Sequence, residues 1–197
     1  MQAGLYESFC AAFGDAVRNL RVGAPHDAST NVGPLSSAAH RDKVSQYIQL
    51  GVDEGGELLA GGPGAPDTLT PDLAGGYFVR PTAFRGLPHA TSRVAREEIF
   101  GPVVTVHSFT DEADAVALAN DSPYGLSASV WTERIGVAHR VARALDVGTV
   151  WVNTWLHRDL RVPFGGVKDS GTGREGGAHS LDFYSEWKTV CVKIGPP

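Results

Sequence analysis

The chain has 197 residues, a net charge of −5 and 42% apolar residues, which is enough for a domain with a sizeable core. Its lysines and arginines are scattered, so the charge pattern excludes nucleic-acid binding as the main role. No apolar run is long enough to cross a bilayer, and the first residues lack the features of a secretory signal. We therefore expect a soluble, cytoplasmic protein without a membrane partner.

The apolar pattern of the first part predicts two helices followed by a short strand. Apolar side chains recur at near-helical spacing over residues 5–20. A second helix begins after Ser36 or Ser37, either of which can cap it. A strand follows at residues 57–60, and the Gly- and Pro-rich stretch 61–76 predicts a surface loop. The inward side chains of the second helix are Val44, Tyr47 and Ile48.

From residue 103 onward, strands and helices alternate. The pattern predicts strands at residues 103–109, 126–132 and 149–153, with helices at residues 111–120 and 133–146 between them. The second of these helices is expected to end at Gly148 in a left-handed cap. This order predicts parallel βαβ units and an α/β fold with an open, mostly parallel sheet. Because ligands of such sheets bind at the carboxyl ends of strands, the segment after Asn153 is a candidate site.

The hexapeptide EEIFGP at residues 97–102 places a carboxylate and an aromatic ring two residues apart at a Gly-Pro bend. A carboxylate accepts two hydrogen bonds and so suits a ribose diol, and an aromatic ring beside it can lie against a nicotinamide. The alternative is a charged strand end followed by a core phenylalanine.

The segment 151–164 places aromatic side chains, an amide and two arginines after the carboxyl end of a strand. Arginines there can bind a substrate carboxylate through paired, charge-assisted hydrogen bonds, and aromatic rings can line a narrow channel. The alternative is that Arg158 or Arg161 forms a structural ion pair with Asp159 or with a neighbouring subunit.

Residues 171–176, GTGREG, match the dinucleotide fingerprint G-x-G-x-x-G. That fingerprint needs a strand before it, a helix that begins within it and a further strand beyond. Residues 167–170 predict a turn, and too little chain follows for the rest of the unit. We interpret these glycines as allowing a loop to cross closely packed backbone.

The two cysteines and seven histidines show no spacing typical of a disulfide framework or a metal site, so we expect no bound metal. Cys10 falls on or beside the buried face of the first helix, with no histidine or basic neighbour to activate it as a nucleophile. A small core thiol is therefore favoured over a nucleophile, and the same interpretation applies to Cys191.

Five separated motifs together resemble those of the aldehyde dehydrogenase superfamily, occur in that family's order and cover essentially the whole chain. The stretch 155–161 and the motif after it resemble the branch that oxidises 2-hydroxymuconic and 2-aminomuconic semialdehydes, in which an arginine of this loop holds the substrate carboxylate. The five motifs are EEIFGP at 97–102, NDSPYGL at 120–126, GTVWVN at 148–153, PFGG at 163–166 with Lys168, Ser170 and Gly171, and GRE at 173–175.

This resemblance implies cofactor-binding roles for four residues. Glu98 would bind the hydroxyls of the nicotinamide ribose, and Phe100 would pack beside the nicotinamide. Lys43 matches a family position near the cofactor, and His40 lies nearby where many relatives have glutamine.

The resemblance also implies the residues that would contact an aldehyde substrate. Phe164 would line the aldehyde channel, and Trp155, Arg158 and Arg161 would determine which aldehyde enters.

The family's catalytic machinery has no counterpart in this chain. Family enzymes attack the aldehyde with a cysteine thiolate, pass hydride to NAD or NADP, and hydrolyse the resulting thioester with water activated by a glutamate. That cysteine, that glutamate and the dinucleotide fold are unmatched here. We therefore expect the C-terminal portion of an NAD(P)-dependent semialdehyde dehydrogenase, without catalytic residues of its own, inactive and unable to bind the cofactor when alone.

The expected domains are a partial catalytic domain at residues 1–183 and an oligomerisation arm at 184–197. Residues 188–194 alternate with period two, which predicts a terminal strand that needs a partner sheet. Family members pair such strands across subunits, so the resemblance implies a homo-oligomer. The alternative is a non-catalytic partner that docks through this strand onto a full-length relative.

Overall fold

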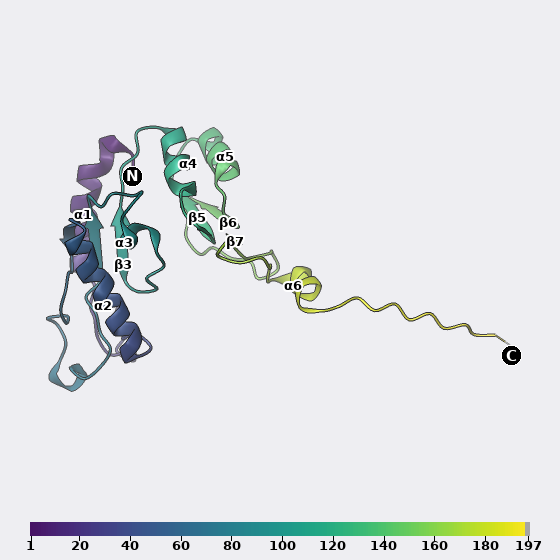
Figure 1. The fold of residues 1–197 in the computed structure, drawn as a ribbon, viewed down its shortest axis with the longest axis horizontal. Coiled ribbons are helices and arrows are strands. Elements are labelled where there is room, and N and C mark those ends of the chain that lie inside the picture. Colours follow the sequence, from purple (N-terminus) through teal and green to yellow (C-terminus); the bar gives the residue numbers. More distant parts are fainter. Residues whose placement is uncertain (196–197) are drawn as a thin grey trace. The chain divides into compact units, whose positions relative to one another are not determined.

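The computed structural model describes residues 1–195. Within them the chain forms two compact units, residues 1–118 and the residues from 119 onward, and each unit has its own sheets (Figure 1). No helix in this described part of the chain is both long and apolar enough to span a membrane.

Two long helices begin the first unit, as the apolar periodicity predicts. Helix α1 spans Tyr6–Arg18 after a single 3₁₀ turn, η1 (Ala3–Leu5). Helix α2 spans Ala38–Asp53, and its cap is Ser37, whose hydroxyl accepts a hydrogen bond from the His40 backbone at 3.2 Å.

The sheet of the first unit has three strands, β1 (Glu57–Ala60), β2 (Thr82–Arg85) and β3 (Val103–Val106). Strand β2 lies in the centre, antiparallel to β1 and parallel to β3. The loop between β1 and β2 contains one 3₁₀ turn, η2 (Pro71–Leu73), and the short helix α3 (Arg93–Arg96) lies between β2 and β3.

The main hydrophobic core lies between α2 and β2, because Phe84 of β2 packs against the inward face of α2. The predicted inward residues Val44 and Ile48 are fully buried, and Tyr47 packs at the edge of this core. The complete cluster is Val44, Ile48, Val79, Phe84, Leu87, Val94 and Ile99.

The second unit is built around one parallel βαβ crossover. Strands β5 (Ser127–Val130) and β6 (Thr149–Val152) pair in parallel, and helix α5 (Ile135–Ala144) connects them. Two-residue strands β4 (Tyr124–Gly125) and β7 (Val167–Lys168) pair antiparallel. Helix α4 (Glu112–Asn120) begins in the first unit and ends at the start of the second, and α6 (Gly177–Tyr184) is the last helix described.

The prediction of one open, mostly parallel sheet is wrong in its extent, although the α/β class is confirmed. The described residues form three small sheets, and two of their four strand pairings are antiparallel. Periodicity identifies a strand by its own side chains, but the partner of a strand depends on residues far away in the sequence.

Gly148 is required by close packing and not by the predicted helix cap. Helix α5 already ends at Ala144, and Leu145 follows it in an extended conformation. A Cβ atom on Gly148 would lie 1.7 Å from the Gly165 carbonyl oxygen. The Pro-Phe-Gly-Gly segment therefore crosses the start of β6 at a distance that only glycine allows.

The fingerprint-like glycines at residues 171–176 also belong to a tightly packed loop. The predicted turn before them is wrong for Val167 and Lys168, which form β7, but this strand is antiparallel and only two residues long. Gly176 has φ +102°, and its Cβ would lie 2.3 Å from the Val162 carbonyl oxygen. In the described residues no strand follows α6, so the segment lacks the βαβ setting of a dinucleotide site.

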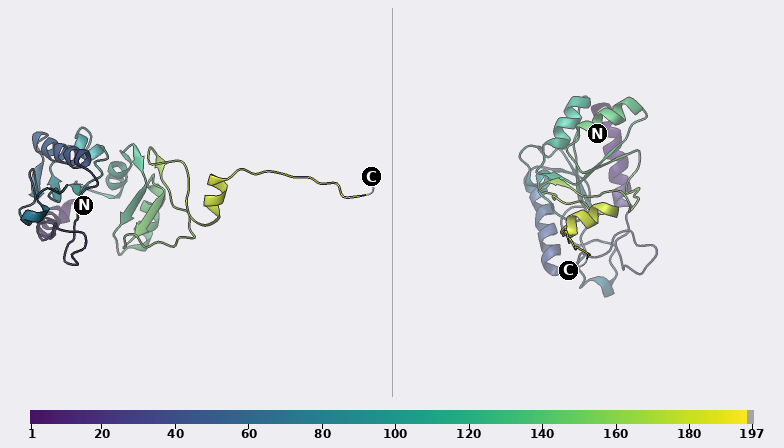
Figure 2. Two further views of the ribbon diagram at one scale, coloured as in Figure 1. Left: turned by 90° about the horizontal axis from the view of Figure 1, so that it is seen from below. Right: turned by 90° about the vertical axis from the view of Figure 1, so that its right-hand side faces the viewer.

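Residues 185–195 extend beyond α6 and form no helix or strand in the described chain (Figure 2). Their apolar side chains are exposed, including Trp187 and Ile194. A β-strand is defined by hydrogen bonds to a partner, so the predicted terminal strand stays a prediction about a complex. The last part of the predicted arm, residues 196–197, lies outside the described residues.

The close packing at Gly148 predicts that Gly148→Ala lowers the free energy of unfolding by about 3 kcal/mol, since an added methyl group meets backbone that cannot move away. All four tryptophans, Trp131, Trp151, Trp155 and Trp187, lie in the second unit. Their fluorescence during urea unfolding therefore measures this effect.

Gly136→Ala is the matched control, because Gly136 lies in α5 and the nearest atom to its added Cβ is a side-chain nitrogen 3.5 Å away. We expect this control to stabilise the unit by about 0.5 kcal/mol. Equal changes in the two variants would contradict the account of Gly148.

Candidate functional site

The acidic-aromatic segment, residues 97–102, lies between α3 and β3. Ile99 is buried in the core of the first unit, and its neighbours Glu98 and Phe100 are exposed. Phe100 is 75% exposed and has φ +61°, a backbone conformation that is uncommon for bulky residues and typical of functional positions. The alternative of a core phenylalanine at this position is wrong.

Two contacts from helix α2 support Glu98 and Gly101 of this segment. Lys43 donates a hydrogen bond from Nζ to the Glu98 backbone carbonyl at 3.0 Å. Gly101 packs so closely on Val44 that an added Cβ would lie 2.6 Å from Cγ2 of that valine. The bend after Phe100 therefore rests directly on the helix.

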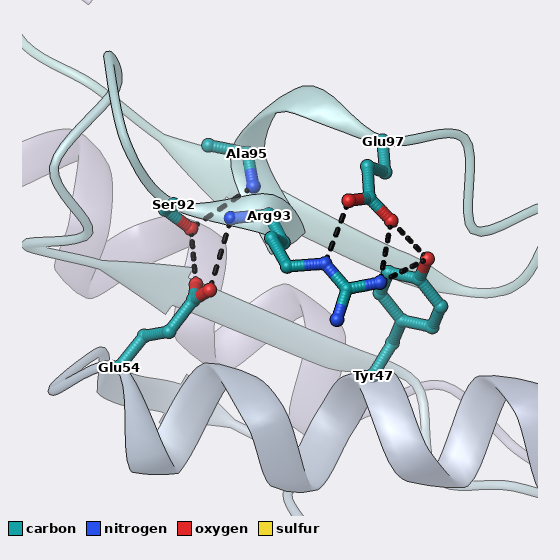
Figure 3. Close-up of polar contacts among 6 residues, drawn as sticks. All are labelled: Tyr47, Glu54, Ser92, Arg93, Ala95 and Glu97. Atoms are coloured by element: carbon teal, nitrogen blue, oxygen red, sulfur yellow. Dashed lines mark hydrogen bonds and ion pairs between the residues drawn. The ribbon is translucent and has the colours of Figure 1, made fainter.

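Glu97 is held by two side chains, those of Arg93 and Tyr47 (Figure 3). Arg93 donates to its carboxylate through Nε at 2.6 Å and through Nη2 at 3.0 Å, and the Tyr47 hydroxyl donates to Oε2. These three residues, called the Glu97 clamp below, join α3 to α2.

The start of α3 is fixed by a second contact with α2, also visible in Figure 3. Glu54 accepts hydrogen bonds from the Ser92 hydroxyl at 2.5 Å and from the Arg93 backbone at 2.9 Å. Ser92 in turn caps α3 by accepting from the Ala95 backbone at 3.1 Å. Both ends of α3 are therefore attached to α2, and the acidic-aromatic segment leaves α3 in a fixed direction.

The Glu97 clamp keeps its two acidic groups in opposite protonation states. The hydrogen bonds from Arg93 lower the pKa of Glu97 to about 2, with the Tyr47 hydroxyl as the next cause. The hydrogen bond to Glu97 raises the pKa of Tyr47. Glu97 is thus ionised and Tyr47 protonated over the ordinary pH range, which preserves the hydrogen bond between them.

His40 lies on the first turn of α2, beside Phe100. The centroids of the two rings are 6.2 Å apart, and Nδ1 of His40 lies 3.2 Å from the Ser36 hydroxyl. The Nε2 atom is buried and finds no hydrogen-bond partner among residues 1–195. A buried imidazole nitrogen without a partner is costly, and a ligand group can satisfy it.

The structure therefore brings together the four residues expected at the cofactor. His40 and Lys43 are three residues apart on one helix, and they contact Phe100 and Glu98, respectively. This surface offers a carboxylate, an ammonium group, an imidazole nitrogen and an aromatic ring, which are groups that the ribose and ring portions of a nucleotide can use.

A second candidate surface lies in the other unit, on the loop after β6. The loop begins at two packed tryptophans, since the Trp151 and Trp155 rings are 5.0 Å apart at an angle of 68°. Trp151 also donates from Nε1 to the His157 carbonyl at 2.9 Å. Trp155 is exposed beside this buried anchor.

Arg158 lies against an aromatic ring and a carboxylate that come from different parts of the chain. Its guanidinium carbon is 4.0 Å from the centroid of the Phe164 ring, and Nη2 is 3.3 Å from Oε1 of Glu175. Phe164 and Glu175 pair through two backbone hydrogen bonds of 2.8 Å each. Glu175 is not among the site residues predicted from the sequence, because only this backbone pairing places it beside Arg158.

Arg161 forms a local ion pair. Its Nε and Nη2 atoms donate to the two carboxylate oxygens of Asp159 over 2.5–3.1 Å, and the arginine side chain is 88% exposed. The alternative of a structural pair with Asp159 is therefore confirmed for Arg161, whereas Arg158 pairs with Glu175.

The cysteines differ from each other in the structure. Cys10 is buried on α1, as expected of a core thiol. Cys191 is exposed, so its interpretation as a core residue is wrong, because residues 185–195 pack against no sheet in the described chain. Among residues 1–195 no cluster of three or more His, Cys, Asp or Glu side chains could hold a metal ion.

Comparison with known proteins identifies the family. The model of the aldehyde dehydrogenase family matches residues 1–190. The chain is 49% identical over 190 residues to 2-hydroxymuconic semialdehyde dehydrogenase of Pseudomonas sp. (strain CF600), covering 96% of this chain and 38% of that protein. It is 44% identical over 193 residues to 2-aminomuconic semialdehyde dehydrogenase of Danio rerio, covering 98% of this chain and 39% of that protein.

Solved structures give the same result. Betaine aldehyde dehydrogenase from Staphylococcus aureus, solved in complex with NAD+, matches with 40% identity and a TM-score of 0.87, over 93% of this chain and 36% of that chain. HpcC from Thermus thermophilus matches with 41% identity and a TM-score of 0.89, over 100% of this chain and 38% of that chain.

The chain belongs to the aldehyde dehydrogenase family. The resemblance deduced from the five motifs, including the similarity to the muconic semialdehyde enzymes, is thereby confirmed. The chain spans less than two fifths of the length of these curated relatives.

The Glu97 clamp predicts a pH-dependent contribution to stability that Glu97→Gln removes. Glu97 has a lower pKa in the folded chain than its ordinary 4.5. Its ionised form therefore stabilises the fold above pH 4.5, and this contribution is lost as the pH falls from 4.5 toward 2. The Glu97 side chain is 40% exposed, so solvent screens its interactions. We therefore expect Glu97→Gln to lower the free energy of unfolding by about 0.5–1 kcal/mol at pH 7, and by less below pH 4.5.

Urea unfolding followed by far-UV circular dichroism at several pH values measures this difference. Asp42→Asn is the control, because Asp42 forms an ion pair with Arg41, its immediate neighbour on α2, and so joins no second element to that helix. A loss for Asp42→Asn as large as that for Glu97→Gln would show that general surface charge, and not the clamp, is responsible.

Proposed function

We propose that this chain forms part of an NAD(P)-dependent aldehyde dehydrogenase that oxidises a carboxylate-bearing semialdehyde to the acid. The observation that supports this most is the grouping of the four expected cofactor residues on one surface, beside the buried Nε2 of His40. The substrate class is supported by the muconic semialdehyde dehydrogenases among the relatives and by the contacts of Arg158 with Phe164 and Glu175.

The residues of the first surface fit a nicotinamide cofactor. The Glu98 carboxylate accepts hydrogen bonds from the ribose hydroxyls, and Lys43 fixes the backbone of Glu98. Phe100 lies beside the nicotinamide, and His40 offers Nε2 to a polar group of the cofactor. When bound, NAD or NADP accepts hydride from the substrate.

The residues of the second surface select the aldehyde. Phe164 lines the aldehyde channel, and Trp155 adds an apolar wall. Arg158 lies on the Phe164 ring, and its guanidinium binds the distal carboxylate of the substrate through paired hydrogen bonds. Arg161 is a second candidate, although its guanidinium is already engaged by Asp159.

We assign no catalytic residue to this chain. Cys10 is buried in α1. The sequence predicts no counterpart of the family's nucleophile or general base in this chain. We therefore propose that the nucleophilic thiolate, the glutamate that activates water and the dinucleotide fold belong to the part of the enzyme that this chain does not span, and that this chain is inactive alone. A cytoplasmic location remains a prediction of the sequence.

Residues 184–197 are proposed as an oligomerisation arm attached to a partial catalytic domain of residues 1–183. The exposed apolar side chains of Trp187, Val190, Val192 and Ile194 support a partner sheet for this segment, and we propose that a second copy of the enzyme supplies it. The same exposure supports the other candidate function, a non-catalytic partner of a full-length relative. Fixed stoichiometry on co-purification with such a relative would favour that second function.

A chimeric enzyme tests the cofactor role of Glu98. In it, the 190 matched residues of this chain replace the corresponding region of the Pseudomonas 2-hydroxymuconic semialdehyde dehydrogenase. We expect Glu98→Gln to raise the KM for NAD+ about 10-fold, because a neutral amide accepts weaker hydrogen bonds than a carboxylate. Asp53→Asn on the same helix as Lys43 is the control, and a KM unchanged by Glu98→Gln would contradict the assignment.

The same chimera tests the substrate role of Arg158. We expect Arg158→Ala to raise the KM for 2-hydroxymuconic semialdehyde at least about 10-fold and to leave the KM for hexanal, which has no carboxylate, within about twofold. Arg161→Ala should have a smaller effect, since its guanidinium is occupied by Asp159. Equal losses for both aldehydes after Arg158→Ala would argue against carboxylate binding at this residue.

A further inference from the structure

The contact between Arg158 and Glu175 joins the loop after β6 to the GRE segment seventeen residues along the chain. We propose that Glu175 is a positioning residue that holds the Arg158 guanidinium on the Phe164 ring, ready for a substrate carboxylate. This inference rests on the proposed function, since it concerns how the same site selects its aldehyde.

The backbone places Phe164 and Glu175 directly opposite each other. Each residue donates its N–H to the carbonyl of the other at 2.8 Å, which makes them a hydrogen-bonded antiparallel pair. Side chains of such a pair project to the same face. The ring and the carboxylate therefore form a corner, and Arg158 lies in it with contacts of 4.0 Å to the ring centroid and 3.3 Å to Oε1.

This corner restricts the guanidinium and leaves most of its donors available. The bond to Glu175 uses Nη2, while a guanidinium has five N–H donors in a planar fork. The ring covers one face of that plane, so rotation about the side chain is limited. A substrate carboxylate can then bind the remaining edge through two parallel hydrogen bonds without first ordering a mobile side chain.

Because both side chains of the ion pair are partly exposed, we expect the pair to orient the Arg158 guanidinium and to add little to the stability of the fold. The Glu175 side chain is 58% exposed and that of Arg158 is 33% exposed, so solvent screens their attraction. Arg161 offers a contrast in the same loop, because its ion pair with Asp159 joins residues two positions apart and includes no ring.

Three substitutions of Glu175 in the chimeric enzyme separate these effects. Glu175→Ala removes the contact, and Glu175→Asp keeps the charge on a side chain one methylene shorter, too short for the present contact. We expect both to raise the KM for 2-hydroxymuconic semialdehyde about 5-fold, with kcat and the KM for hexanal within about twofold. Glu175→Gln retains an acceptor at the same distance from the backbone, and it should keep the KM for 2-hydroxymuconic semialdehyde within about twofold of the value for the unsubstituted chimera.

Asp169→Asn is the charge-matched control, because Asp169 is exposed in the turn after β7. Its hydrogen bond to the Pro123 carbonyl comes from the backbone N–H, which the substitution leaves in place. This control should leave both KM values unchanged. Tryptophan fluorescence and thermal unfolding of each variant check the fold of the second unit. If Glu175→Ala fails to fold, Glu175→Asp against Glu175→Gln gives the same comparison.

Two results would overturn the inference. An equal change in KM for the two aldehydes would show a general structural role for Glu175. A lower KM for the carboxylate-bearing aldehyde would show that Glu175 competes with the substrate for Arg158. Arg158→Ala distinguishes these failures from failure of the proposed function: if Arg158→Ala also leaves the preference between the aldehydes unchanged, the carboxylate site itself is wrong.

Discussion

The ion pair between Arg93 and Glu97, completed by the Tyr47 hydroxyl, is the interaction on which the first candidate surface depends. A helix of four residues has no stability of its own, so α3 needs tertiary contacts at both ends. The Glu97 clamp and Glu54 supply them from a single helix, α2, and its C-terminal cap. The chain that leaves α3 can then bury Ile99 and hold Phe100 exposed in a left-handed conformation, whose cost the buried contacts offset.

The second surface follows the same physical rule with different groups. Two segments that cross as an antiparallel pair place Phe164 and Glu175 around Arg158, and the residue after Phe164 passes close to the backbone of Gly148. In both units, a side chain suited to ligand binding is supported by residues distant in the sequence, whereas local pairs such as Arg161 with Asp159 add little order. Rigid support of this kind gives a binding group its direction before a ligand arrives.

Much of the secondary structure and the family could be predicted from the sequence, because both depend on local patterns. Periodicity located α1, α2, α5 and the strands around them, and the motifs indicated the family that the comparisons confirm. The sheet partners, the position of Glu175 and the role of Gly148 could not be predicted, since each depends on which distant segments meet. The exposure of Cys191 was missed because a strand pattern says nothing about whether a partner is present.

The central claim is that Glu98 and Phe100, held on α2, form the nicotinamide-ribose surface of an aldehyde dehydrogenase. A crystal structure of the chimeric enzyme with NAD+ tests it most directly. The account predicts that the Glu98 carboxylate lies about 2.5–3.0 Å from the ribose hydroxyls, with the Phe100 ring beside the nicotinamide and Glu97 still bound to Arg93. A ribose bound elsewhere, with Glu98 in contact only with solvent, would contradict it.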